Sequence, residues 1–273
     1  MEFLLLFVVA AFSGIIGALV GLGGGVILVP VVLFLGNTLG LIENITPQTV
    51  VGLSVIMMIF IGISSTVSYM KSKTVHFKTG LIFFAGSVPG TILGAWINKG
   101  LDLPSFNLYF GILLIIIATI LIFRDKLKPV RWFVEHGTQY EYIDAQGNKY
   151  IYGYPVWFAL GLTFVVGGMS GLFGIGGGSI LVPAMLILFL FPPHVAVAKS
   201  MFLVFLTALV NSASHIALGH VPWLYTIPVI IGGYLGAKIG AKINKSLNSE
   251  KIVLALRIVL LLIGIYSVLN ALL

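Results

Sequence analysis

The sequence predicts an all-α polytopic membrane protein of two inverted repeats of about five membrane segments, each with a Gly-rich helix break or re-entrant hairpin. Three observations support this fold class. Hydrophobic residues make up 59% of the chain and charged residues only 8%. The apolar residues form long segments that short polar breaks separate. A glycine-rich decapeptide occurs twice, as GLGGGVILVP from Gly21 and as GIGGGSILVP from Gly174.

The composition excludes a water-soluble globular protein. Soluble domains carry roughly 25% charged residues, so a chain with 8% must expose most of its surface to lipid. The chain has no cysteine, which excludes disulfides, thiol catalysis and thiolate-bound metals. The formal net charge of +7 is not gathered into a basic surface. We therefore expect no nucleic-acid partner and interpret the excess Lys and Arg as orientation signals.

The apolar segments are interrupted by one long polar stretch, residues 124–153. The end of this stretch, YEYIDAQGNKYIY, alternates around a Gln-Gly-Asn turn and favours a small hairpin. We divide the chain into a first transmembrane repeat (1–123), a cytoplasmic polar connector (124–153) and a second transmembrane repeat (154–273). The expected membrane segments are 3–20, 26–42, 48–70, 79–97, 106–123, 155–171, 179–191, 194–217, 222–243 and 250–272.

The duplication extends far beyond the decapeptide. Residues 47–101 match residues 193–247 at a constant spacing of 146, so that Ser54 corresponds to Ser200. Because this register holds for polar as well as apolar residues, an internal duplication explains the match better than low complexity. Glycines at every fourth position have the small-xxx-small spacing that brings membrane helices close together. These glycines are Gly86, Gly90, Gly94, Gly232, Gly236 and Gly240.

The two repeats are expected to have opposite orientations. One continuous helix over residues 3–36 would be about 51 Å long, whereas the hydrocarbon core is about 30 Å thick. The chain is therefore expected to reverse at residues 21–25. With this reversal, Lys99 is the one Lys or Arg on its side of the membrane, and the positive-inside rule makes the other side the cytoplasm. We expect a multi-pass protein of the cell (cytoplasmic) membrane with both termini outside.

The two glycine triplets are the first candidates for a binding site. Secondary transporters built from inverted repeats bind their substrates where the halves meet, near interrupted helices. The free N–H groups and the dipole of the following helix favour an anion, and glycine allows close approach to the backbone. A tight helical hairpin without a ligand is the alternative. The candidate substrate-binding residues are Gly23, Gly24, Gly25, Gly176, Gly177, Gly178 and Ser179.

Polar side chains inside apolar segments are further candidates, because they are costly in lipid. SSTVS from Ser64 aligns with VNSAS from Val210, so matching hydroxyl and amide groups could line one cavity. Interhelical hydrogen bonding is the alternative. Lys199 could attract an anion or extend to the interface, and His215 is a proton-coupling candidate or a packed histidine. The additional substrate-binding candidates are Ser64, Ser65, Asn211, Ser212 and Lys199.

The acidic residues argue against a cation carrier. All eight Asp and Glu residues lie in loops or at segment ends, so no buried carboxylate is available for a proton relay or a divalent-cation site. This favours an anionic or neutral substrate. The histidines do not have the spacing of metal ligands, and no nucleophile–base pair is evident. We therefore expect neither an enzyme nor a metal or cofactor.

The paired decapeptides, the duplicated halves and the chain length resemble the sulfite exporter TauE/SafE family, also called the toluenesulfonate uptake permease family. The resemblance covers essentially the whole chain. It implies a transporter of sulfite, sulfonates, sulfoacetate or related small anions by alternating access, with export as the expected direction and both glycine triplets at the transport core. A carrier of another small anion or carboxylate and a non-transporting scaffold are the alternatives. The expected partners are a small anionic substrate and the lipid bilayer, and a homo-oligomer is a further possibility.

Overall fold

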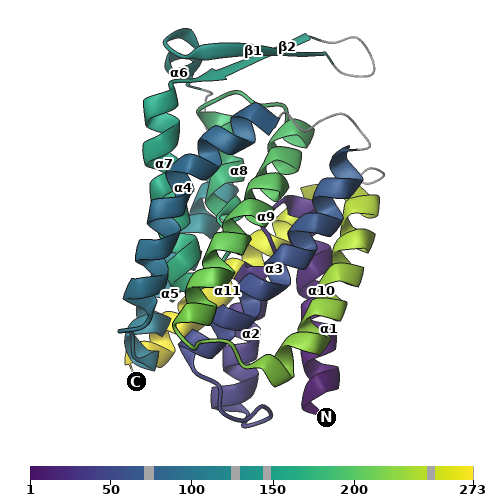
Figure 1. Ribbon diagram of the computed structural model, residues 1–273, viewed down its shortest axis with the longest axis vertical. Coiled ribbons are helices and arrows are strands. Elements are labelled where there is room, and N and C mark those ends of the chain that lie inside the picture. The colour runs from purple at the N-terminus through teal and green to yellow at the C-terminus, as the bar shows by residue number, and fades with distance from the viewer. Residues whose placement is uncertain (71–76, 124–129, 144–148, 245–249, 273) are drawn as a thin grey trace.

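The computed structural model is a helical bundle with a small antiparallel hairpin at one end (Figure 1). Seven of the helices in the part of the chain described below are long and apolar enough to cross a membrane, which confirms an all-α polytopic membrane protein. They are α1 (Glu2–Val20), α3 (Pro47–Met70), α4 (Phe77–Asn98), α5 (Leu103–Phe123), α7 (Val156–Phe173), α9 (Pro193–Ala217) and α10 (Trp223–Asn244). The structure describes residues 1–70, 77–123, 130–143, 149–244 and 250–272.

The remaining elements complete the fold, and they include the predicted hairpin. Its strands pair from Thr138 opposite Tyr154 to Ile143 opposite Lys149, while the predicted turn falls outside the described residues. A π-helix, which the sequence did not predict, extends one of the short helices. The elements are α2 (Gly25–Leu33), π-helix η1 (Phe34–Thr38), α6 (Trp132–Glu135), β1 (Thr138–Ile143), β2 (Lys149–Tyr154), α8 (Gly178–Ile187) and α11 (Glu250–Leu272).

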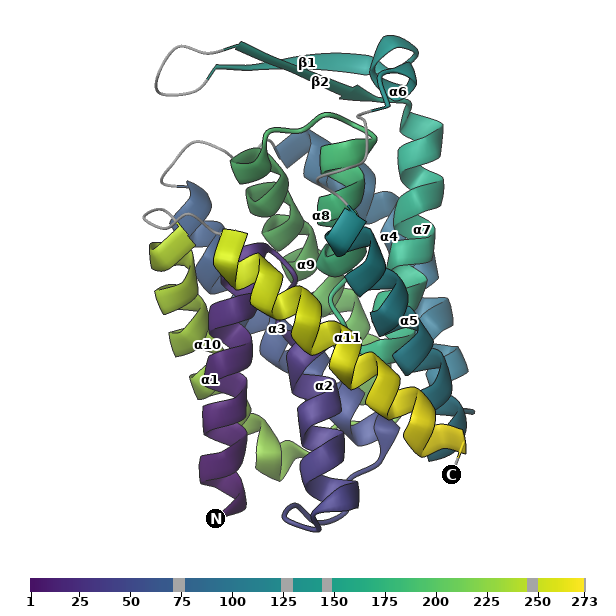
Figure 2. The same cartoon turned by 180° about the vertical axis from the view of Figure 1, so that it is seen from behind.

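Glycines separate α1 from α2 and α7 from α8. Gly21 and Gly174 end α1 and α7 with left-handed φ angles of 82° and 67°. Gly24 and Gly177 precede α2 and α8 with φ angles of 86° and 66°. Residues other than glycine rarely adopt this conformation without strain. After the break, α2 runs back toward the end of the molecule at which α1 begins (Figure 2).

The most extensive packing joins helices from opposite halves of the sequence. α1 packs along α10, α4 along α7 and α5 along α11, while α3 and α9 meet at the centre. Gly236 and Gly240 of α10 approach the backbone of α1 so closely that a Cβ would not fit. Gly90 and Gly94 of α4 approach α7 in the same way. The small-residue spacing therefore serves helix packing, as predicted.

The hairpin and the chain ends lie at opposite ends of the bundle (Figure 1). The hairpin is fixed to the turn that follows α8, because the Gly153 N–H donates a hydrogen bond to the Phe189 carbonyl at 3.1 Å. Buried aromatic rings fill the space beneath it, including those of Tyr152, Tyr154 and Phe191. A second, larger apolar core occupies the centre of the bundle. The hairpin is thus joined to the membrane helices by both backbone and side-chain contacts.

Candidate functional site

The two glycine turns meet inside the molecule. All of residues 21–25 and 174–178 are buried. A Cβ placed on Gly23 would lie 3.5 Å from the Cα of Gly176, and the reverse distance is also 3.5 Å. The two backbones therefore touch with no side chain between them. We call residues 21–25 and 174–178 together the glycine crossing.

Each turn of the glycine crossing receives a hydrogen bond from a serine of the opposite half. Ser54 Oγ on α3 donates to the Gly174 carbonyl at 2.6 Å, and Ser200 Oγ on α9 donates to the Gly21 carbonyl at 2.7 Å. Carbonyl groups at helix ends have no partner within their own helix. The two matching serines, which the duplication had aligned, thus satisfy the ends of α1 and α7 and join the two halves.

The first residues of α2 and α8 are glycines because nothing larger fits. A Cβ on Gly25 would overlap the carbonyl oxygen of Gly174, and a Cβ on Gly178 would overlap that of Gly21. Neither contact can be relieved by a side-chain rotation, since both involve backbone atoms. A larger residue at either position would push the two turns apart. The triplets predicted as a binding site are therefore also a close backbone contact between the halves.

The polar candidates on α3 and α9 lie on opposite sides of the crossing. Met58 and Val204 contact Gly23 there, and α3 and α9 run through it in opposite directions (Figure 1). Ser65 follows Met58 by seven residues on α3, and Asn211 follows Val204 by seven residues on α9. Because the two helices run in opposite directions, these side chains lie about 10 Å from the crossing on opposite sides of it. The structure thus brings the glycines together but separates the two polar groups.

The neighbours of these side chains also differ. Ser64 Oγ donates to the Tyr234 carbonyl of α10 at 3.4 Å. Asn211 Nδ2 donates to the Ser170 carbonyl of α7 at 3.0 Å. The polar group on α3, which includes Ser64 and Ser65, therefore contacts α10. The polar group on α9, which includes Asn211 and Ser212, contacts α7.

Several buried polar atoms in these groups have no hydrogen-bond partner among the described residues. Such atoms are rare in proteins, and they mark places where water or a ligand can complete the hydrogen bonding. Two pairs of them occupy matching positions in the two repeats, at the same spacing of 146. The atoms are the hydroxyl oxygens of Ser65, Thr66, Ser179 and Ser212 and the amide oxygen of Asn211.

His215 forms a hydrogen-bonded pair with His220. The two Nδ1 atoms are 2.9 Å apart, and His215 Nε2 lies 3.0 Å from the Gly171 carbonyl. Because a carbonyl only accepts, His215 Nε2 carries a proton, and in the neutral ring its Nδ1 accepts from His220. Burial and, to a smaller extent, the charge of Lys99 lower the pKa of His220. The pair can therefore gain one further proton, at His220 Nε2.

Lys199 is enclosed by aromatic rings, although its predicted alternative was extension to the interface. Its side chain is 2% exposed, and Nζ donates to the Tyr152 hydroxyl at 3.2 Å. Nζ lies 4.6 Å from the centroid of the Tyr152 ring and 4.4 Å from that of Phe191. These distances permit cation–π attraction. Tyr152 belongs to the hairpin, so the connector contacts a candidate site residue directly.

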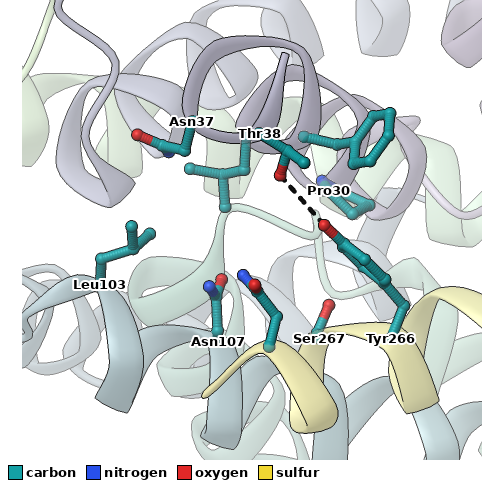
Figure 3. Close-up of a pocket in the computed structure, with 10 residues that line it drawn as sticks. Pro30, Asn37, Thr38, Leu103, Asn107, Tyr266 and Ser267 are labelled. Atoms are coloured by element: carbon teal, nitrogen blue, oxygen red, sulfur yellow. Dashed lines mark hydrogen bonds between the residues drawn. The ribbon is translucent and has the colours of Figure 1, made fainter. Parts of the chain in front are cut away.

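A polar pocket that the sequence analysis missed lies away from the hairpin, between η1, α5 and α11 (Figure 3). The space between its lining residues, open solvent included, is about 320 Å³. Thr38 Oγ1 and Tyr266 Oη share a hydrogen bond of 3.0 Å beside it. Polar residues inside the apolar segments 106–123 and 250–272 were the available signal, and π-helices are frequent at functional sites. The polar lining residues are Asn37, Thr38, Asn107, Tyr266, Ser267 and Asn270.

Several known proteins resemble this chain over most of its length. The family model described as "Sulfite exporter TauE/SafE" matches residues 6–267. The probable membrane transporter protein YunE of Bacillus subtilis is 45% identical over 264 residues, which cover 97% of this chain and 96% of that protein. A probable membrane transporter protein of Methanocaldococcus jannaschii is 25% identical, with 97% and 95% covered.

A third relative, a probable membrane transporter protein of Xylella fastidiosa, is 22% identical over 85% of this chain and 82% of its own length. No solved structure matches the chain. The family model nonetheless spans nearly the whole chain, and so does the match to the Bacillus subtilis protein. The predicted resemblance is thereby confirmed: the chain is a membrane transporter that belongs to the sulfite exporter TauE/SafE family.

Proposed function

We propose that the protein is a secondary transporter that moves small sulfur-containing anions of the sulfite, sulfonate or sulfoacetate type across the cytoplasmic membrane, with export as its direction. The observation that carries this proposal is the glycine crossing. Irregular backbone at membrane depth is tolerated only where it is buried in protein or lines a cavity. Two buried turns, each followed by the start of a helix, have the features of a midplane substrate site in such transporters.

The two halves act as inverted repeats, residues 1–123 and 154–273. Exchanging the halves converts the α1–α10 pair into the α7–α4 pair, and both pairs pack closely. The same exchange converts the Ser54–Gly174 bond into the Ser200–Gly21 bond. A pseudo-two-fold axis in the membrane plane relates repeats in this way. The hairpin end, which carries Arg131 and Lys149, faces the cytoplasm.

The substrate binds at the glycine crossing and is passed between the two polar groups on either side of it. Every acidic residue lies in a loop or at the end of an apolar segment, and the starts of α2 and α8 are positive helix ends, so the site favours an anion. Unpaired buried hydroxyl and amide atoms supply its hydrogen bonds. The substrate-binding residues are Gly23, Gly24, Gly25, Gly176, Gly177, Gly178, Ser179, Ser64, Ser65, Asn211, Ser212 and Lys199, and His215 couples transport to protons.

Flux of labelled sulfite into proteoliposomes tests this function. Sulfate, sulfoacetate, taurine and acetate serve as competitors, with and without an imposed pH gradient. We expect saturable uptake that sulfur oxyanions block and acetate does not. Acetate competition would instead favour a carboxylate carrier, and no flux through protein shown to be intact would contradict the sulfur assignment.

Glycine variants connect the flux to the crossing. Gly24→Val and Gly177→Val each place a branched side chain on a left-handed residue of a buried turn. We expect both to abolish flux while the protein stays monodisperse. Gly161→Ala is the matched control, because a Cβ at Gly161 meets no atom within 4 Å. Wild-type flux in either valine variant would remove the glycine crossing from the mechanism.

A further inference from the structure

The hairpin covers one end of α9. The described residues that hold it there belong to β2 and to the segment before α6. The Gly153 N–H donates to the Phe189 carbonyl at 3.1 Å, and the Val130 N–H donates to the Ile187 carbonyl at 3.0 Å. Both acceptors belong to the last residue of α8 or the turn that leads into α9. Tyr152, between these contacts, is fully buried. The hairpin therefore closes the end of the bundle at which Lys199 lies.

Lys199 lacks a negatively charged partner in this enclosure. An ammonium group has three N–H donors, and the described residues provide one hydrogen bond, to Tyr152. No carboxylate in the described part of the chain forms an ion pair with Lys199. Burial raises the pKa of Tyr152 to about 12, so its hydroxyl stays neutral and supplies no negative charge. Aromatic rings attract the cation, but the one hydrogen-bond acceptor that the described residues give it is a neutral hydroxyl.

An oxyanion would supply what the enclosure lacks. Charge-assisted hydrogen bonds from an ammonium group to an anionic oxygen are stronger than those to a neutral hydroxyl. An anion that reached Lys199 would therefore replace the Tyr152 hydroxyl as its hydrogen-bond acceptor. That replacement would remove the one side-chain hydrogen bond that joins Lys199 to the hairpin.

The arrangement exists in one half only. Leu53 occupies the position that matches Lys199 at the spacing of 146, and it is fully buried. The hairpin also lies at one end of the bundle (Figure 2). Lys199 directly precedes Ser200, whose hydroxyl donates to the Gly21 carbonyl in the glycine crossing. A movement of the backbone at Lys199 would thus also move the neighbouring residue, Ser200, which joins the two halves.

We propose that Lys199 is the site at which a small oxyanion first binds from the hairpin side, and that the β1–β2 hairpin is a lid which opens when the anion displaces Tyr152 from Lys199. This inference rests on the proposed function for the choice of sulfur oxyanions as ligands. It adds a one-sided entry site and a role for the connector. The hairpin is closed without an anion and open with one.

Cysteine labelling tests the lid without measuring transport. The chain has no cysteine, so Val195→Cys, at a fully buried residue of the cluster beneath the hairpin, provides a single reporter. Its reaction with a membrane-impermeant maleimide is followed in inside-out vesicles with increasing sulfoacetate or chloride, because sulfite would itself add to the maleimide. We expect sulfoacetate to accelerate labelling about tenfold, with saturation, and chloride to have little effect.

Variants in the reporter background identify the residues responsible. Lys199→Met is expected to make the labelling rate independent of sulfoacetate, and Lys199→Arg to retain the response. Tyr152→Ala is expected to raise the rate without sulfoacetate about tenfold, because it removes both the ring and the hydroxyl from Lys199. Ile151→Ala is the matched control on the same strand, since Ile151 is 62% exposed, and it should leave the rate unchanged.

The outcomes separate this inference from the proposed function. A labelling rate that does not change with sulfoacetate, or an equal sulfoacetate response in Lys199→Met, overturns the anion site at Lys199 even if sulfite flux is normal. Absence of flux with every anion, combined with a sulfoacetate response that requires Lys199, supports the site and contradicts transport. Equal rates in Tyr152→Ala and Ile151→Ala overturn the hairpin as the lid.

Discussion

Single residues hold the centre of this transporter together across its two halves. Ser54 and Ser200 each satisfy a carbonyl group at the end of a helix in the opposite half. Both serines are fully buried, so no water can replace them easily. The same two carbonyl groups also leave no room for a side chain on the glycines that face them, Gly25 and Gly178. The hydrogen bonds and the close backbone approach therefore depend on each other.

Ser54→Ala and Ser200→Ala should each lower the free energy of unfolding by about 1–3 kcal/mol, because each leaves a buried carbonyl group unsatisfied. The two losses should be similar, since the bonds match. Ser214→Ala is the control, because Ser214 donates to a carbonyl of its own helix, that of Val210. Denaturant unfolding in one detergent provides the measurement. Losses no larger than that of Ser214→Ala would show that the cross-half bonds contribute little.

The histidine pair should make stability depend on pH. Burial lowers the pKa of His220 in the folded protein, so the unfolded chain binds the proton more readily. Folding stability is therefore lost as the pH falls below the unfolded value of about 6.5. His220→Gln should weaken this loss, whereas His194→Gln, at an exposed residue, should not. Thermal unfolding between pH 8 and pH 5 measures this loss of stability. Parallel pH curves for the wild type, His220→Gln and His194→Gln would contradict the role of His220.

Whole elements were predicted well where the sequence is periodic. The glycine spacing on α4 and α10 and the alternation that forms β1 and β2 both follow from local chemistry. The segment expected over 26–42 instead contains the α2 helix followed by η1, because the extra residues of the first repeat have no periodic signal. The partners of Lys199 were also hidden, since Tyr152 is 47 positions away and meets it only through the folded hairpin.

The α4–α7 contact should not tolerate a larger residue. In Gly90→Val the Cβ would overlap the Phe164 carbonyl, and helix backbones must separate to relieve this. We expect a loss of at least about 1–3 kcal/mol in the free energy of unfolding. In Gly161→Val on α7 the Cβ lies in open space, so this variant should change the free energy of unfolding by less than about 1 kcal/mol. Equal thermal stability of the two variants in the same lipid would contradict helix packing as the role of Gly90.

The whole molecule has two unlike ends. One end carries the hairpin, and the other carries both termini and the polar pocket between η1, α5 and α11 (Figures 1 and 3). The sequence predicted the placement of the connector and the termini from the distribution of Lys and Arg. It did not predict the pocket, because the residues that line it come from three distant segments. Each end therefore offers a different surface to an arriving solute.

Topology can be measured directly with single cysteines. Glu141→Cys on the hairpin should react with an impermeant maleimide in inside-out vesicles, because we propose from the positive-inside rule that the hairpin faces the cytoplasm. Leu39→Cys, at a residue 50% exposed just after η1, should react in intact cells. Labelling of both cysteines from the same side would contradict the inverted arrangement, and exchanged sides would reverse the orientation.

The bond between Ser200 and Gly21 also sets an order of events during synthesis. The two residues are 179 positions apart, and ribosomes add roughly 5–20 residues per second. The end of α1 therefore waits about 10–40 s in the membrane before the helix that satisfies it has been made. During that interval the first half is a nascent chain with an exposed polar helix end. The centre of the molecule can form only after α9 has been inserted, so assembly finishes late and from the C-terminal half.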